Sequence, residues 1–256
     1  MATGMSYERL LDGQIFRVFE RSTGQTIYVR APIYFHDDFG GADLAIPEAG
    51  SDESGCKWVK EIAGAGTAVK QIDLEGGGII CATTAVTDTI IAGVCMDDIN
   101  PYHPGVSVAT QTGLQVEFRI IYTCASVTNQ DMFVGLIGDY SESSTVLDST
   151  ERIGFFFDAA LTPLCVSEDG TNSGSATSGQ LFVTAVAHVL RIDLTDPTDC
   201  KFYIDGVRKA AGTTFTMEDI TTERLQPFFG VFNNGTAGSN AVTVACTDCK
   251  IWQAYA

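Results

Sequence analysis

The chain has 256 residues, 45% of them hydrophobic, and its 32 acidic and 15 basic side chains give a net charge of −17. No run of Lys or Arg interrupts this acidity, which argues against a naked nucleic acid as partner because phosphate binding needs a basic patch. No run of about 18 apolar residues occurs, so we predict no membrane span. The opening "MATGMSYERLLDGQIFRVFERS" lacks the basic start and apolar block of a secretory signal, so we expect synthesis in a cytoplasm.

Residues 1–31 precede the main domain and have the pattern of short strands, ending before Pro32. We predict either an N-terminal arm that reaches a neighbouring molecule or further strands of the same domain, and the sequence leaves both open. In an arm, Phe16, Val18 and Phe19 are the candidate partner-binding residues, because an exposed strand can pair with a partner chain.

The segment 40–110 is less regular, with a polar loop at 40–55 and a glycine-punctuated hairpin at 64–84. Within it, "CMDDINPYHPG" brings Asp97, Asp98 and Asn100 together. Oxygen-rich loops of this kind bind calcium, so these three residues are calcium candidates. An ordinary Asx turn before Pro101 is the favoured alternative, and no other metal or cofactor is expected.

From residue 114 onward, short runs of alternating apolar and polar residues are separated by turn clusters. In "LQVEFRIIYTC" (114–124) and "HVLRIDLTD" (188–196), alternate residues are apolar, which predicts strands with one buried face. Asp205-Gly206 is a strong signal for a two-residue hairpin turn. Only "TMEDITTERL" (216–225) predicts a short helix, with Thr216 as its cap. Many short strands with frequent turns predict an all-β antiparallel sandwich or jelly roll.

The eight cysteines are predicted to be buried free thiols, because the chain is long and shows no secretory signal. "CTDC" gives Cys246 and Cys249 a spacing known from zinc sites, but a single pair does not supply four ligands. In a regular strand the two side chains would point to opposite faces and would converge only at a bulge or turn. We therefore predict no metal at this pair.

Catalytic patterns are absent from the sequence. Glycosidases of the sandwich class need two carboxyl groups a few ångströms apart, commonly as Glu-x-Asp-x-x-Glu on one strand, and no Glu here is followed by Asp two residues later. Glu117 and Arg119 are predicted to form an outward ion pair, and His188 shares the apolar parity of Leu190. The nucleophile elbow and the phosphate loop are also missing, so we predict no catalytic residues and no enzyme.

The C-terminal half resembles the concanavalin A-like (laminin-G and pentraxin-like) sandwich. The residues that carry the resemblance are "HVLRIDLTDPTDCKFYIDGVRK", the closing "LQPFFGVFNNGTAGSNAVTVACTDCKIWQAYA" and the central "GLQVEFRIIYTCASVTNQDMFVGLIGD". The resemblance covers roughly residues 33–256. It implies one concanavalin A-like jelly-roll domain over 32–256, with residues 1–31 as an arm or extra strands.

The same combination resembles bacteriophage structural proteins on this sandwich, especially capsid decoration (cement) proteins. This resemblance implies a non-enzymatic virion protein on the outer capsid surface that binds the major capsid protein and forms a homo-oligomer, commonly a trimer. The alternative is a lectin-like, carbohydrate-binding module on a phage particle or tail, and a glycoside hydrolase ranks third. Candidate sugar-stacking residues for the alternative are Trp58, Tyr140, Tyr203, Trp252 and Tyr255.

Overall fold

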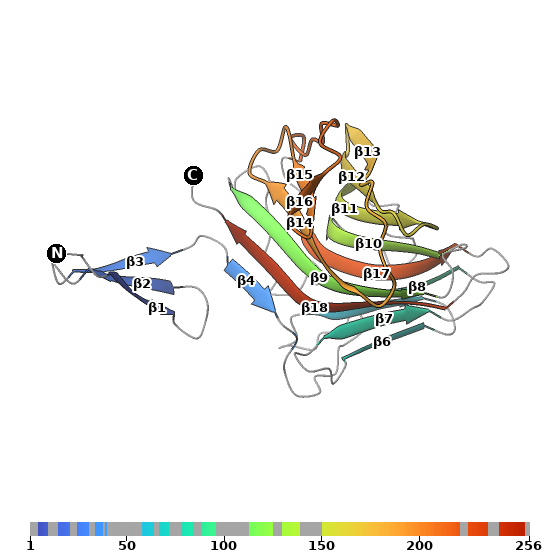
Figure 1. Ribbon diagram of the computed structural model, residues 1–256, viewed down its shortest axis with the longest axis horizontal. Helices are drawn as coiled ribbons and strands as arrows, with labels where there is room; N and C mark the ends of the chain where they lie inside the picture. The colour runs from blue at the N-terminus through green and yellow to red at the C-terminus, as the bar shows by residue number, and fades with distance from the viewer. Residues whose placement is uncertain are drawn as a thin grey trace.

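The protein is described by a computed structural model in which two antiparallel sheets pack face to face (Figure 1). The residues described are 5–9, 15–20, 25–30, 34–37, 39, 58–63, 67–71, 78–83, 89–95, 113–124, 130–138, 150–220, 225–234 and 241–253. Every strand pair among them is antiparallel, and these residues contain no helix, so the predicted all-β antiparallel sandwich is confirmed. Accordingly, no helix of this part is long and apolar enough to cross a membrane.

The first large sheet has seven strands. In spatial order they are β13 (Ser173–Thr177), β12 (Leu164–Asp169), β11 (Glu151–Asp158), β10 (Gln130–Ile137), β17 (Gln226–Asn234), β8 (Thr89–Cys95) and β5 (Val59–Ala63). Strands far apart in sequence, such as β10 and β17, are therefore direct neighbours in this sheet.

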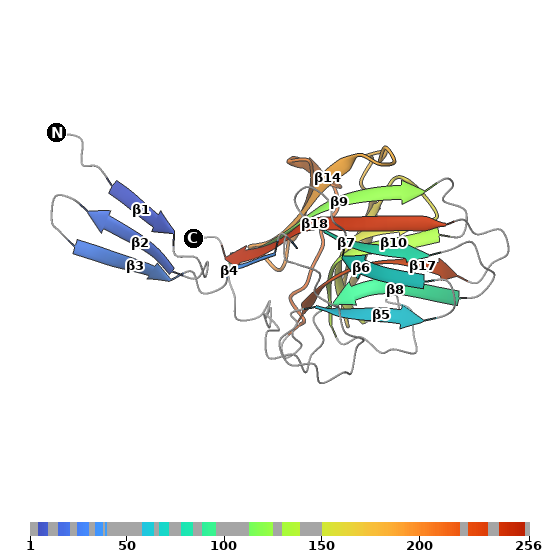
Figure 2. The same ribbon diagram turned by 90° about the horizontal axis from the view of Figure 1, so that it is seen from below.

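The second large sheet has eight strands. Seven of them follow the order β16 (Val207–Lys209), β15 (Lys201–Ile204), β14 (Ala187–Leu194), β9 (Leu114–Cys124), β18 (Val242–Gln253), β7 (Ile79–Thr83) and β6 (Thr67–Gln71). The eighth, β4 (Tyr34–Asp37), pairs with the last part of β18, as Figure 2 shows.

The core lies between the two sheets and follows the predicted alternation. On β9 the inward side chains are at most 1% exposed, namely Leu114, Val116, Phe118, Ile120 and Tyr122, whereas Arg119 and Thr123 point the other way and are exposed. Aromatic rings link the sheets, with Phe155 of β11 packing edge-on against Phe202 of β15 at 5.3 Å between ring centroids. Burying each such side chain stabilises the fold by roughly 1.5–3 kcal/mol.

The hairpin between β15 and β16 turns at Asp205-Gly206, as predicted. Both residues have positive φ, 51° and 78°, which a two-residue turn of this kind requires. Asp205 has a second task that the sequence did not reveal. Its carboxylate accepts the Val189 N–H at 2.9 Å and contacts Nδ1 of His188 at 2.7 Å, which ties the turn to β14.

The N-terminal segment forms a three-stranded sheet of its own from β1 (Met5–Arg9), β2 (Ile15–Glu20) and β3 (Gln25–Arg30). The candidates Phe16, Val18 and Phe19 lie on β2, the middle strand, whose backbone is paired on both sides. A partner strand would therefore have to pair with β1 or β3. The role of residues 1–31 as an arm stays a prediction.

The short helix predicted at 216–225 is not formed in the described residues. The Met217 N–H donates to the Pro197 carbonyl oxygen at 2.7 Å, and Thr216 accepts the Glu218 N–H at 3.3 Å, so the segment makes a turn instead. Met217 and Ile220 are buried, and this tertiary packing overrides the local helix signal.

Candidate functional site

A row of four charged side chains and one tyrosine crosses the outer face of the eight-stranded sheet, meaning the face turned away from the core. Pairing register places Glu117 of β9 between Arg191 of β14 and Lys250 of β18. On the next strands, Tyr203 lies opposite Arg191, and Arg208 lies opposite Tyr203. Residues directly opposite in an antiparallel pair are about 5 Å apart, so these five residues form one continuous row, here called the charged row.

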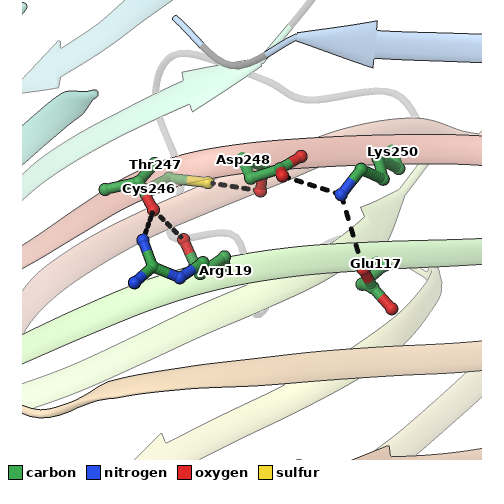
Figure 3. Close-up of polar contacts among 6 residues, drawn as sticks. All are labelled: Glu117, Arg119, Cys246, Thr247, Asp248 and Lys250. Carbon is green, nitrogen blue, oxygen red and sulfur yellow. Dashed lines mark hydrogen bonds and ion pairs between the residues drawn. The ribbon is translucent and has the colours of Figure 1, made fainter. Parts of the chain in front are cut away.

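At one end of the charged row, Lys250 joins two carboxylates (Figure 3). Its Nζ is 2.7 Å from Oδ2 of Asp248 and 3.8 Å from Oε1 of Glu117. These side chains are roughly one-quarter to one-third exposed, so each pair contributes only about 0–1 kcal/mol to stability. Their effect is mainly to fix the positions of the charges on this face.

A β-bulge in β18 decides which side chains reach the outer face. The register shifts between Cys246 and Asp248, so Thr247 is the extra residue. Nη1 of Arg119 donates to the Thr247 hydroxyl at 2.9 Å, and that hydroxyl donates to the Arg119 carbonyl oxygen at 3.3 Å. Bulges often re-aim side chains in this way beside functional sites.

The same bulge turns both thiols of "CTDC" toward the core, which is the condition the sequence left open. Cys246 and Cys249 are fully buried, and burial raises the pKa of each thiol, so both stay protonated. The six cysteines whose side chains the structure describes are free thiols, as predicted; five of them are buried, and Cys124 is half-buried. No group of three His, Cys, Asp or Glu side chains that could hold a metal occurs among the described residues.

The outward ion pair predicted between Glu117 and Arg119 is not what forms. Both residues do lie on the outer face, but alternate positions on one strand are farther apart than directly opposed positions on adjacent strands. Each side chain therefore finds its partner on β18, Glu117 with Lys250 and Arg119 with Thr247 (Figure 3).

In the middle of the charged row, Arg191 stacks on Tyr203. The guanidinium carbon lies 4.2 Å from the ring centroid, which is a cation–π contact. Nε of Arg191 is buried and has no hydrogen-bond partner among the described residues. The ring thus orients the guanidinium without consuming its donors.

Among the side chains that the structure describes, two accessible aromatic ones lie on this face, Tyr203 and Trp252, both half-buried. Trp252 stands opposite Gln115 in the row next to the charged row. Trp58, by contrast, is 6% exposed, packs against Phe39 and Phe229, and donates its indole N–H to Asp37. The other two aromatic candidates, Tyr140 and Tyr255, lie outside the described residues.

The outer face of the seven-stranded sheet has a different character. Phe133 of β10 and Phe228 and Phe232 of β17 are at most 2% exposed, although they are not part of the core between the sheets. Two of these rings lie over glycines of neighbouring strands: a Cβ added at Gly154 would meet the Phe133 ring at 2.6 Å, and one added at Gly93 would meet the Phe228 ring at 2.5 Å. This face is packed and apolar along its central strands.

One carboxyl group that the sequence did not single out, Asp131, lies on β10 directly opposite Asp158 of β11. Its side chain accepts the Ala159 N–H at 3.0 Å. Burial raises the pKa of Asp131, and the nearby Asp158 charge raises it further. Apolar alternation gives no signal for such a group, since its neighbours decide its state.

The remaining predicted residues fall into two groups. The calcium candidates Asp97, Asp98 and Asn100 lie outside the described residues. His188 is buried, as its parity predicted, with its ring 4.1 Å from the Phe182 ring, and its Nε2 has no partner among the described residues.

No protein-family model and no curated protein sequence matches the chain. An endo-acting O-glycanase of the human gut microbiota, described as initiating mucin breakdown, matches with a TM-score of 0.57 and 12% identity over 86% of this chain and 99% of that one. A glycoside hydrolase family 16 endo-glucanase from Bacteroides ovatus matches with a TM-score of 0.56 and 13% identity, covering 85% and 99%. A protein of unknown function from Shewanella oneidensis matches with a TM-score of 0.54 and 12% identity, covering 88% and 89%.

These likenesses show the fold, a concanavalin A-like jelly-roll sandwich, as the sequence predicted. They also contradict the prediction that the chain is not an enzyme, because two of the three structures are an endo-glucanase and an endo-acting O-glycanase on the same sandwich. The missing Glu-x-Asp-x-x-Glu spacing alone is therefore no reason to exclude catalysis.

Proposed function

We propose that the protein is a carbohydrate-binding module and that it binds glycans on the outer face of the eight-stranded sheet. The observation that carries this proposal is the charged row with Tyr203 and Trp252 on the same face. Sugar-binding sites combine a ring that packs against the apolar side of the sugar with a few fixed polar groups for its hydroxyls. The glycan-active proteins that share this fold support the proposal.

The strands of the seven-stranded sheet carry no Tyr or Trp, and one Phe on its outer face, Phe156, is half-buried. Its central aromatic side chains, Phe133, Phe228 and Phe232, are buried and lack polar atoms. The eight-stranded sheet instead presents Glu117, Lys250 and further polar side chains that are partly exposed. This difference is why we assign binding to the eight-stranded sheet.

The proposal is tested by probing a glycan array with the full chain and measuring affinities of the hits by calorimetry. Tyr203→Ala should weaken binding by about 10-fold, which corresponds to about 1.4 kcal/mol. Tyr203→Phe keeps the ring and is the matched control, so its affinity should stay within about 2-fold of wild type. An array that stays blank, with and without calcium, would remove the proposal.

A second candidate, glycan hydrolysis, is favoured by the opposed carboxyl groups of Asp131 and Asp158. A general acid must be protonated at working pH, and burial raises the pKa of Asp131 in that direction. Incubation with β-glucan and mucin O-glycans, followed by a reducing-end assay, tests it. Activity that survives in a folded Asp131→Asn variant would exclude Asp131 as the acid.

Capsid decoration receives no support from the similar structures. Binding to a major capsid protein, a trimeric state and a place on the outer virion surface therefore stay predictions from resemblance. Copurification of the protein with intact virions is the measurement that tests them.

A further inference from the structure

We propose that the outer face of the eight-stranded sheet selects acidic saccharides, those bearing carboxylate or sulfate groups, through Arg191, Arg208 and Lys201 around Tyr203. This inference rests on the proposed function and names the class of glycan that the face takes. The three basic residues are called the cation cluster below.

The cation cluster surrounds a single aromatic ring. Arg191 of β14 and Arg208 of β16 lie directly opposite Tyr203 on its two sides. Lys201 precedes Tyr203 by two positions on β15 and therefore shares its face. Directly opposed residues are about 5 Å apart, so three positive charges lie within reach of one small ligand.

No carboxylate of the described residues forms an ion pair with the cation cluster, although Lys201 also interacts electrostatically with the exposed Asp196. Other basic residues of the described part are engaged: Arg152 pairs with Glu168 at 2.6 Å, Lys250 with Asp248 at 2.7 Å, and Lys209 donates to Gln180 at 2.7 Å. Among the same residues, Arg191, Arg208 and Lys201 have no ion pair within 4.0 Å.

The carboxylates nearest to the cluster in the pairing register are engaged elsewhere. Asp193, opposite Lys201, accepts the Thr195 N–H at 3.0 Å, and Glu117, opposite Arg191, lies 3.8 Å from Lys250. Unpaired cations that remain accessible are free to bind an external anion.

Arg191 is held in a suitable orientation for such an anion. Its guanidinium carbon lies over the Tyr203 ring, 4.2 Å from the centroid. A planar guanidinium binds a carboxylate or sulfate through two parallel hydrogen bonds, which a lysine ammonium does not reproduce. The adjacent ring edge offers a surface for the sugar that carries the acid group.

Basic side chains outnumber acidic ones on the outer face of the eight-stranded sheet, whereas the chain as a whole is acidic. On β9, β14, β15, β16 and β18, this face carries five cations, Arg119, Arg191, Lys201, Arg208 and Lys250, against three carboxylates, Glu117, Asp193 and Asp248. The chain as a whole has a net charge of −17.

Screening limits interactions to about 8 Å at physiological ionic strength, so a short acidic ligand experiences mainly the local cations. A long polyanion would also extend over acidic surface and be repelled. This contrast favours an acidic saccharide over a nucleic acid.

The test compares ligands of matched length on the full chain by calorimetry at two salt concentrations. The four probes are a uronic-acid tetrasaccharide, a sulfated tetrasaccharide, a neutral gluco-tetrasaccharide and a tetranucleotide. We expect at least one acidic saccharide to bind about 10-fold or more tightly than the neutral one, with an affinity that falls as salt rises.

Substitutions in the cation cluster test whether these residues cause the preference for acidic saccharides. Arg191→Ala and Arg208→Ala should each weaken acidic-saccharide binding by about 10-fold and weaken neutral-saccharide binding by a clearly smaller factor, so that the preference for the acidic saccharide falls. Arg191→Lys should restore only part of the affinity, because the charge returns without the bidentate geometry. Arg152→Ala, on the other sheet and paired with Glu168, is the matched control and should change nothing.

The outcomes separate the two proposals. Neutral saccharides binding as tightly as acidic ones would overturn the acidic preference and leave glycan binding standing. A tetranucleotide binding as tightly as the acidic saccharides would overturn it as well, by showing a general anion site. Failure of every saccharide would overturn both the inference and the proposed function.

Discussion

On the eight-stranded sheet, the outward positions of β9, β14 and β15 carry mostly polar and charged side chains that are at least partly exposed, with Ile121, Ala187 and Val189 as the apolar exceptions. On the seven-stranded sheet, outward positions of β10 and β17 carry Phe133, Phe228 and Phe232, which are at most 2% exposed. In both sheets successive side chains point to opposite faces, so the residue types decide what each outer face carries. β9 alternates between apolar and mostly polar residues, whereas "MFVGLI" in β10 is a continuous apolar run, as expected for a strand buried on both faces.

The largest expected effect comes from placing a lysine at Ile251, which the register beyond the bulge turns toward the core. Burying an unpaired Lys costs several kcal/mol, so we expect Ile251→Lys to lose the folded state, measured by thermal unfolding in circular dichroism. Trp252→Lys, one position along and on the outer face, is the control and should stay folded. An Ile251→Lys variant with the wild-type Tm would disprove the register.

The outer faces of the two sheets are compared directly by truncating one aromatic side chain on each. Phe133→Ala should lower the free energy of unfolding by about 3–5 kcal/mol, because it removes a fully buried ring. Tyr203→Ala, at a half-buried position, should cost about 1 kcal/mol or less while weakening glycan binding. Urea titration measures both, and equal losses would mean that the two faces are equally structural.

Close packing on the seven-stranded sheet is tested by adding a methyl group. In Gly154→Ala the new Cβ would meet the Val134 carbonyl oxygen at 2.5 Å and the Phe133 ring at 2.6 Å, so we expect a loss of about 1–3 kcal/mol. Gly212→Ala is the control, since nothing lies within 4 Å of its added Cβ. Chemical denaturation of the two variants should differ clearly, and a neutral Gly154→Ala would contradict the packing described for this face.

The smallest effect concerns pH. Burial raises the pKa of Asp131 above its ordinary value of 3.8, so the folded protein keeps a proton that the unfolded chain releases. Stability must then fall as pH rises through the window above 3.8, and Asp131→Asn should remove this loss and be slightly more stable than wild type at neutral pH. Unfolding measured from pH 3.5 to 7 checks the sign.

Asp169 is the control for Asp131, because its pKa is shifted in the opposite direction. Burial alone would raise its pKa, but hydrogen bonds from Asn172, Thr171 and Asp219 together lower it. Its stabilising contribution is therefore present above the ordinary value and is lost as pH falls through the lowered pKa. The pH dependence of the unfolding free energy is compared between the wild type and each variant. If Asp131→Asn and Asp169→Asn altered that dependence on the same side of pH 3.8, both assignments would be contradicted.

Part of the candidate site could be read from the chain. The hairpin at Asp205-Gly206 makes Tyr203 and Arg208 equidistant from the turn, so their pairing follows from the turn type. The contact between Arg191 and Tyr203 did not follow, because the connection between β14 and β15 does not fix a register by itself. The partners of Glu117 and Arg119 were misjudged for the same reason: their strand neighbour β18 lies more than 120 residues away in sequence.

The sequence by itself determined the alternation of β9 and β14, the hairpin turn, the buried thiols and hence the sandwich, because side-chain period and turn chemistry are local properties. Only the tertiary structure decided strand order, and with it the charged row, in which β16, β15, β14, β9 and β18 each place one residue. It also decided that Thr247 bulges, so that Cys246 and Cys249 face the core while Asp248 and Lys250 face outward. A local pattern tells which residues share a face of one strand, whereas a binding surface needs to know which strands lie side by side.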